Sequence, residues 1–382
     1  MSLQIVLTRA APARRSRLLL RHLRAMSSGT AADEVILEKN KNAGVITLNR
    51  PKALNALNLS MIRTIYPKLQ EWNSDPGTSM VIIKAAGGKA FCAGGDIKAV
   101  TDAGKVGDSL AVNFFREEYI LNHAIGTLKK PYVAFIHGIT MGGGVGLSVH
   151  GKFRVATEKT LFAMPETAIG LFPDVGGGYF LPRLPGKLGL YLALTGYRLK
   201  GRDVHHAGVA THFIESEKLP QLEEELVGLS AADDNSVGQI LDRHHSQCKL
   251  DADKPFSLID HRGDIDRLFG GESVEQILLD LEKEGSEWSL QQLETLKKMS
   301  PTSMKITHRQ LVKGKTASFS DVFLMEYRMS QGCIRGHDFY EGVRAVLVDK
   351  DHTPKWKPDT LKGVTLDMVD EHFKPLPNDL KL

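Results

Sequence analysis

The spacing of apolar residues predicts strands that alternate with helices over the first 215 or so residues. Short, mainly apolar segments typical of strands occur at residues 35–37, 45–48, 79–85, 132–136 and 153–156. Apolar residues recur at helical spacing over 58–72 and 111–125, and we expect Pro67 to kink or end the first of these helices. The first two strands flank a turn-prone stretch and predict a hairpin. The alternation indicates an α/β fold with mainly parallel strands.

The pattern changes near residue 219, after which no convincing strand appears. Helical spacing continues in the segments 219–229, 274–281, 290–299 and 321–334. We therefore predict a catalytic core over residues 33–218 and a mostly helical C-terminal region over 219–382.

The first 32 residues have a different composition from the rest. They contain six arginines and no acidic residue, interspersed with Leu, Ala and Ser. This composition is typical of a mitochondrial transit peptide and predicts a location in the mitochondrial matrix, although a disordered basic arm or a nucleic-acid-binding tail is the alternative. Without this leader the chain has 43 basic and 45 acidic residues, a net charge of −2, which argues against a nucleic-acid partner.

Other classes of partner find little support in the sequence. No apolar run approaches the ~18 residues of a membrane span, so we expect no membrane insertion. Cys92, Cys248 and Cys333 are far apart and form no C-x-x-C pair, which argues against a disulfide framework or a cysteine zinc site. His205 and His206 lack the spacing of metal ligands, and we predict no metal.

Two glycine-rich segments follow predicted strands. The first is Phe-Cys-Ala-Gly-Gly-Asp-Ile at residues 91–97, where Gly94 and Gly95 would let the backbone approach a ligand. A structural turn is the simpler interpretation of this segment by itself.

The second segment, residues 137–148, contains Gly142, Gly143, Gly144 and Gly146. Each glycine would weaken a helix by roughly 1 kcal/mol relative to alanine, so another property must select them. A backbone N–H at a helix start, directed at a developing negative charge, is such a property. The spacing fits neither a dinucleotide fingerprint, nor a phosphate-binding loop, nor a nucleophile elbow. Ser148 is therefore predicted to be an ordinary helix residue.

Acidic residues occur in unusually apolar surroundings. Glu166 and Asp174 lie in a stretch that is otherwise rich in apolar residues, glycine and proline, and Glu118 has Phe115 and Tyr119 nearby on its predicted helix. Burial would raise the pKa of such carboxyls and suit them to acid–base or nucleophilic catalysis. The alternatives are turn-capping roles for Glu166 and Asp174, and a solvated helix face for Glu118.

Four motifs in this order resemble the crotonase (enoyl-CoA hydratase/isomerase) superfamily: residues 47–57, 91–97, 142–144 and 165–166. The segments 338–345 and 354–356 resemble its C-terminal signature. The resemblance implies a crotonase-like spiral of ββα units with a helical C-terminal module. It also implies an oxyanion hole formed by the N–H groups of Gly95 and Gly143, and a site for the CoA moiety at Lys52, Ala53 and Leu54.

Departures from the family pattern indicate the reaction. The hydratases carry one of their two glutamates where this chain has Gly146, whereas Glu166 remains and Asp174 replaces a glycine. The resemblance therefore implies hydrolysis of a short 3-hydroxyacyl-CoA thioester, a step of valine breakdown. Glu166 would either activate water or attack the thioester, while Asp174 and Glu118 would orient the substrate.

The resemblance also implies that the only small-molecule partner is the acyl-CoA substrate, whose CoA is not a separate cofactor. A homo-oligomer fits the helical tail as well as a monomer does. Two alternatives stay open: a hydratase or isomerase that uses Asp174 as its second acid, and a protein that binds CoA esters without turnover.

Overall fold

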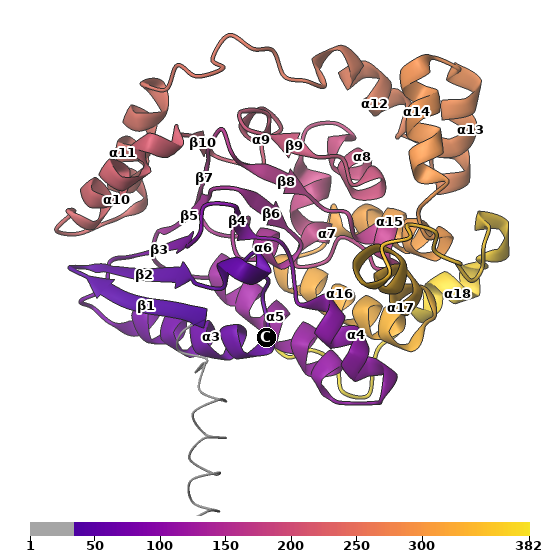
Figure 1. Ribbon diagram of the computed structural model, residues 1–382, viewed down its shortest axis with the longest axis horizontal. Coiled ribbons are helices and arrows are strands. Elements are labelled where there is room, and N and C mark those ends of the chain that lie inside the picture. The colour runs from indigo at the N-terminus through magenta and orange to yellow at the C-terminus, as the bar shows by residue number, and fades with distance from the viewer. Residues whose placement is uncertain (1–33) are drawn as a thin grey trace, which may run out of the picture.

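The computed structural model describes residues 34–382 and contains two sheets wrapped by helices (Figure 1). The transit peptide predicted at residues 1–32 lies outside the described residues. The larger sheet has six strands in the order β1-β2-β3-β5-β7-β10, and the smaller has four in the order β4-β6-β8-β9. The strands are β1 (Val35–Asn40), β2 (Ala43–Leu48), β3 (Met80–Ala85), β4 (Ala90–Cys92), β5 (Tyr132–Ile136), β6 (Ile139–Met141), β7 (Phe153–Ala156), β8 (Leu161–Ala163), β9 (Leu199–Lys200) and β10 (His212–Phe213).

A strand–strand–helix unit recurs along the core and confirms the predicted ββα spiral. Strands β3, β5 and β7 each add in parallel to the larger sheet, and each is followed by a short strand of the smaller sheet. Only β1–β2 and β8–β9 pair antiparallel in the described chain. The helices and helical turns of the core are η1 (Pro51–Ala53), α3 (Leu59–Ser74), α4 (Ile97–Lys105), α5 (Leu110–Gly126), α6 (Gly143–Gly146), η2 (Glu166–Ile169), α7 (Gly177–Phe180), η3 (Leu181–Arg183), α8 (Leu188–Thr195), α9 (Asp203–His206) and η4 (Ser216–Lys218).

The hairpin, the longer strands and both long core helices agree with the sequence predictions. The expectation that Pro67 could end the first helix is wrong, because α3 continues seven residues beyond it. Buried side chains before and after the proline, including Ile65 and Trp72, hold both halves against the core. Packing therefore outweighs the helix-breaking preference of proline. The three-residue strands β4, β6 and β8 were missed, since such short segments carry too little periodicity.

The C-terminal region is helical, and no strand follows β10 in the described chain. Its elements are α10 (Leu219–Val227), α11 (Asp234–Ser246), η5 (Ile259–His261), α12 (Arg262–Leu268), α13 (Val274–Glu284), α14 (Glu287–Leu296), α15 (Pro301–Gly314), α16 (Phe319–Arg335), α17 (Asp338–Val343), the π-helical η6 (Arg344–Val348), η7 (Leu361–Gly363) and α18 (Leu366–Glu371). Helices α10 and α11 lie at the β10 edge, whereas α12 to α18 lie on the opposite side (Figure 1). A boundary at residue 218 stays a prediction, because one apolar core contains side chains from Val35 to Leu380.

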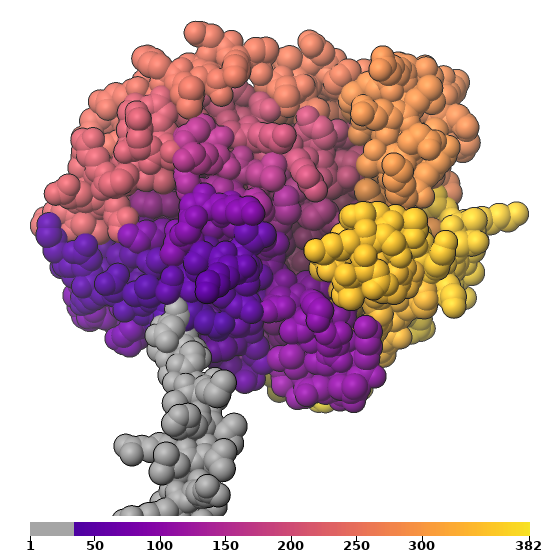
Figure 2. Space-filling model, viewed as in Figure 1, coloured from indigo at the N-terminus to yellow at the C-terminus, as the bar shows by residue number. Residues whose placement is uncertain are grey.

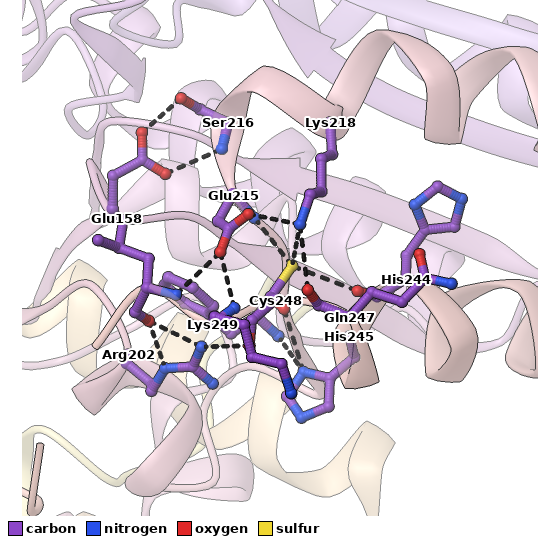
Figure 3. Close-up of polar contacts among 12 residues, drawn as sticks. Glu158, Arg202, Glu215, Ser216, Lys218, His244, His245, Gln247, Cys248 and Lys249 are labelled. Carbon is purple, nitrogen blue, oxygen red and sulfur yellow. Dashed lines mark hydrogen bonds and ion pairs between the residues drawn. The ribbon is translucent and has the colours of Figure 1, made fainter. Parts of the chain in front are cut away.

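Polar contacts fasten α11 and the segment after it to the sheet edge. The Glu215 carboxylate accepts hydrogen bonds from the N–H groups of Lys249 and Leu250 at 2.8 and 2.9 Å, and Arg202 donates to the Leu250 carbonyl oxygen (Figure 3). The thiol of Cys248 lies 3.8 Å from the Lys218 ammonium in the same network. The residues of this network therefore hold the segment after α11 in place, and this structural role explains their contacts.

The C-terminal helices also contact the part of the core that carries the predicted catalytic acid. Figure 2 shows the C-terminal segment, in yellow, beside the segment around residue 100. Behind this contact α17 lies against η2. A Cβ added to Gly342 would stand 2.3 Å from the carbonyl carbon of Ile169, and one added to Gly170 would stand 2.1 Å from the Asp338 oxygen. Backbone therefore meets backbone directly beside Glu166.

Substitution of Gly342 tests this packing. Alanine inside a helix usually stabilises by up to ~1 kcal/mol relative to glycine, but here the methyl group would overlap the η2 backbone, and overpacking costs about 1–3 kcal/mol. We expect Gly342→Ala to lower the melting temperature by several degrees. Gly336→Ala is the control, since its Cβ would meet nothing closer than 3.4 Å. A Gly342→Ala protein as stable as the wild type would show that the two backbones are not in contact.

Candidate active site

The two glycine-rich segments meet in the structure. A Cβ placed on Gly143 would lie 3.4 Å from the backbone nitrogen of Gly95, and a parallel bridge between Leu57 and Gly95 holds the first loop in place. Within the described chain, the N–H groups of Gly95 and Gly143 donate to no protein acceptor. Gly143 is the first residue of α6, where helix geometry leaves an N–H unpaired. Two free donors from separate loops thus lie close together.

Glycine is required at positions 142, 143 and 144 because atoms of other segments lie too close to these residues for a larger side chain. A Cβ on Gly144 would stand 2.2 Å from the carbonyl oxygen of Cys92, so α6 lies directly against β4. Gly142 has a φ of 45°, which favours glycine, and its Cβ position lies 3.2 Å from Oε1 of Glu166. A Cβ on Gly143 would lie 2.7 Å from Oε1 of Glu118. The second loop therefore contacts both glutamates directly.

The structure brings the three predicted acids to this place. Glu118 comes from α5, Glu166 from η2 and Asp174 from the loop that follows, with exposed fractions of 2%, 5% and 4%. Asp174 accepts a hydrogen bond from the Tyr119 hydroxyl at 2.8 Å. Oε1 of Glu118 and Oε2 of Glu166 are buried without a protein partner in the described chain. Their catalytic and substrate-binding roles stay predictions.

Burial dominates the electrostatics of the three carboxyls. It raises the pKa of Asp174 to about 7, although the hydrogen bond from Tyr119 favours the ionised form. Burial raises the pKa of Glu166 well above its ordinary value, and the nearby charge of Asp174 raises it further. The pKa of Glu118 is raised by burial and then by the charges of Asp174 and Glu166. Burial therefore disfavours the ionised form of all three carboxyls.

The loop that carries Asp174 has a strained backbone. Val175 has a φ of 50°, a conformation that a β-branched residue rarely adopts. Its carbonyl oxygen lies 2.6 Å from Nε2 of His150, which fixes the peptide between Val175 and Gly176. Strain of this kind persists only where the surroundings enforce it, so the direction of the Asp174 side chain is set by contacts outside its own loop.

A buried carboxylate from the C-terminal region supplies more of these contacts. Glu326 on α16 accepts hydrogen bonds from the N–H groups of Gly176 and Gly178 at 2.7 and 2.8 Å. Burial nevertheless raises its pKa to about 8. The sequence analysis missed Glu326. Its only signal was an acid on the same helical face as Val322, Phe323 and Met329, which are buried.

The residues predicted to hold CoA form a partly exposed turn beside the first loop. Lys52 is exposed in η1, while Ala53 and Leu54 are half-buried. The adjoining Asn55 anchors this turn by donating hydrogen bonds to the carbonyl oxygens of Ala86 and Ala90 at 3.0 and 2.8 Å. The turn is thus held rigidly beside the glycine loops, and its contact with CoA stays a prediction.

The surroundings of Gly146 and Ser148 bear on two of the sequence predictions. A Cβ on Gly146 would lie 2.7 Å from Cβ of Val175 and 2.8 Å from both amide atoms of Asn122, so no side chain fits there without movement. Ser148 is fully buried and its hydroxyl donates to the carbonyl oxygens of Gly144 and Val145. This hydroxyl therefore satisfies helix carbonyls and is not presented to a substrate.

Searches for metal-binding and membrane-spanning elements concern residues 34–382 alone. No three His, Cys, Asp or Glu side chains there are grouped so that they could hold a metal ion. None of the helices in that range combines the length and the apolar composition needed to cross a bilayer.

Comparisons with known proteins identify close relatives. The model of the enoyl-CoA hydratase/isomerase family matches residues 43–373. The chain is 64% identical over 358 residues to a mitochondrial 3-hydroxyisobutyryl-CoA hydrolase of Danio rerio, with 94% of each chain covered. It is 60% identical to that of Homo sapiens, with 96% of each covered.

Two solved structures share the fold and about a third of the sequence. A carnitinyl-CoA dehydratase from Mycobacterium thermoresistibile is 35% identical with a TM-score of 0.84, covering 91% of this chain and 98% of that one. An enoyl-CoA hydratase from Rhodobacter sphaeroides 2.4.1 is 36% identical with a TM-score of 0.82, covering 91% of this chain and all of that one.

Substitution of Asp174 tests whether ionisation of this buried carboxyl lowers the stability of the folded protein. The pKa of Asp174 in the folded state, about 7, exceeds the ~3.9 of an unfolded chain, so the folded state binds the proton more tightly. The wild type therefore loses stability as pH rises through this window, by roughly 1.4 kcal/mol for each unit of pKa difference.

We expect Asp174→Asn to melt at a higher temperature than the wild type at pH 8 and at a similar temperature at pH 4. Asp253→Asn, at an exposed position, should change neither value. A lower melting temperature for Asp174→Asn at pH 8 would mean that the charged form of Asp174 stabilises the fold.

Proposed function

Because the chain belongs to the enoyl-CoA hydratase/isomerase family, we propose that it hydrolyses the thioester of 3-hydroxyisobutyryl-CoA to the free hydroxy acid and CoA. The curated relatives at 60% identity or more are named for this activity and as mitochondrial. We place the reaction in the mitochondrion, as a step of valine breakdown, and infer 3-hydroxypropionyl-CoA as a second substrate. The CoA group belongs to the substrate, and the reaction needs no separate cofactor.

One observation favours hydrolysis over hydration: the space beside Gly146 is already occupied by other side chains. Addition of water across a double bond needs two acids within proton-transfer range of the substrate. An acid at position 146 would collide with Val175 and Asn122. The two solved neighbours are named as a dehydratase and a hydratase, but the relatives with much higher identity are named as hydrolases. Hydration would require Asp174 to act as the second acid.

The paired glycine N–H groups suit the charge that develops during thioester hydrolysis. Attack on the carbonyl carbon turns the thioester oxygen into an oxyanion, which Gly95 and Gly143 can stabilise because their donors are free and already in place. Each such donor contributes about 3–4 kcal/mol to transition-state stabilisation. Collapse of the tetrahedral species then breaks the C–S bond and releases CoA as a thiolate that takes up a proton.

Glu166 lies where it can start this reaction, since its carboxylate contacts the Gly142 end of the oxyanion loop. It either removes a proton from water or attacks the thioester to form a mixed anhydride that water then opens. Both routes need the ionised form of Glu166, which burial disfavours, so this carboxyl acts only after it has lost its proton. Glu118, whose pKa is raised by burial and by the charges of Asp174 and Glu166, can in its protonated form donate a hydrogen bond beside Gly143. Asp174 then orients the 3-hydroxyl group of the substrate.

Replacing Glu166 tests the assignment. We expect Glu166→Gln to lower the rate of thiol release from 3-hydroxyisobutyryl-CoA at least ~100-fold, because the essential base or nucleophile is lost, with little change in KM. Glu117→Gln, at the position before Glu118 where the carboxylate pairs with Arg63 at the surface, should keep the wild-type rate. Near wild-type turnover by Glu166→Gln would overturn the proposal.

The choice between hydrolysis and hydration is tested with crotonyl-CoA. We expect water addition to this substrate to be at least ~100-fold slower than thiol release from the hydroxyacyl ester, because only one of the two required acids is in place. Hydration that is readily measured in the wild type and abolished by Asp174→Asn would favour the hydratase. A protein that binds CoA esters equally well with or without Glu166, and never releases thiol, would be a binding protein.

A further inference from the structure

Asn122 on α5 is a buried amide whose hydrogen-bonding groups lack protein partners. The residue has no exposed surface, and neither Nδ2 nor Oδ1 has a partner in the described chain. An asparagine amide offers two donors and an acceptor oxygen, so this is a larger deficit than that of a single buried hydroxyl. Buried polar side chains are almost always satisfied, and an unsatisfied one calls for a ligand or a water molecule.

The amide lies between the elements of the proposed active site. Asn122 follows Glu118 by one helical turn and therefore lies on the same face of α5. Between them along the chain, Tyr119 binds Asp174. Across from the amide is Gly146 of α6, whose Cβ position is 2.8 Å from Oδ1 and 2.8 Å from Nδ2. The amide and the Val175 side chain from the Asp174 loop thus both lie against Gly146 of α6.

The absence of a side chain at Gly146 explains how the amide fits. Any Cβ there would overlap the Asn122 amide and the side chain of Val175. Gly146 and Asn122 are therefore a matched pair: one has no side chain where the other places a polar group. The space that an acidic side chain at position 146 would enter therefore holds the Asn122 amide, which is neutral and cannot transfer a proton at neutral pH.

We propose that the Asn122 amide holds the water molecule that is consumed in hydrolysis, an inference that rests on the proposed function. Oδ1 accepts one hydrogen of the water and Glu166 takes the other, which leaves a lone pair of the water oxygen free for the acyl carbon. A C–O bond forms, the C–S bond breaks, and the proton taken by Glu166 passes to the thiolate. If Glu166 first forms an anhydride, the C–S bond breaks in that step, and Asn122 directs the same water to the anhydride. Opening of the anhydride restores the Glu166 carboxylate, and the proton lost by the water passes to the released thiolate. Asn122 acts through the water and is a positioning residue.

The variant Asn122→Leu separates this role from a structural one. Leucine has a similar volume and no hydrogen-bonding group, so replacing an amide without protein partners should leave the melting temperature unchanged or raise it. We expect kcat for thiol release to fall about 10- to 100-fold, since misplaced reactants react more slowly, while KM stays within about two-fold. Asn113→Leu, at a half-buried position earlier in the same helix, should keep the wild-type kcat.

A competing nucleophile gives a readout that a structural defect would not produce. Hydroxylamine added during turnover converts the acyl group to a hydroxamic acid, in competition with the held water. We expect the ratio of hydroxamic acid to free acid to rise at least about 10-fold in Asn122→Leu, because water loses its fixed position and the added nucleophile does not. Asn122→Ala, which empties the space, should raise the same ratio.

The outcomes distinguish the inference from the function on which it rests. If the wild type releases thiol from 3-hydroxyisobutyryl-CoA, and Asn122→Leu keeps both its kcat and its product ratio, the water-holding role is wrong while hydrolysis stands. Failure of both Asn122 variants to fold would make the amide structural and would also overturn the inference. If the wild type releases no thiol, the proposed function fails and this inference fails with it.

Discussion

The burial of three carboxyl groups in one site is the constraint on which the rest of the structure depends. Glu118, Glu166 and Asp174 are almost fully buried, and none of them forms an ion pair within residues 34–382. Buried charges without partners are strongly unfavourable, so such groups hold protons instead. The donors that can stabilise charge during the reaction are consequently neutral backbone N–H groups. The free N–H groups of Gly95 and Gly143 supply two of these without adding another charge to the site.

This constraint explains why the helical C-terminal region is part of the site. The backbone of α17 meets the η2 turn that carries Glu166, and Glu326 of α16 holds the loop that carries Asp174. Buried carboxyls would move toward solvent if their loops were free to move. Contacts from outside each loop keep them together, and the strained backbone of Val175 is evidence of that force. The proposed active site therefore depends on both parts of the chain.

The sequence predicted the order of the long elements and the glycine loops, because periodicity and glycine clusters are local properties. It also predicted that Glu118, Glu166 and Asp174 would matter, since charges in apolar stretches are conspicuous. It did not reveal Glu326 or Asn122. Both lie on ordinary amphipathic helices, and their significance comes from contacts across more than twenty residues. The continuation of α3 through Pro67 was missed for the same reason, because distant packing outweighs a local preference.

Desolvation keeps protons on these three carboxyls at pH values where solvated carboxyls are ionised. Carbon-13 NMR titration of protein labelled at the Asp and Glu carboxyls, with single variants used to assign the signals, measures this directly. We predict that Asp174 titrates near pH 7 and that Glu118 and Glu166 titrate well above their ordinary range. Titration of all three below about pH 5, as for solvated carboxyls, would contradict the account.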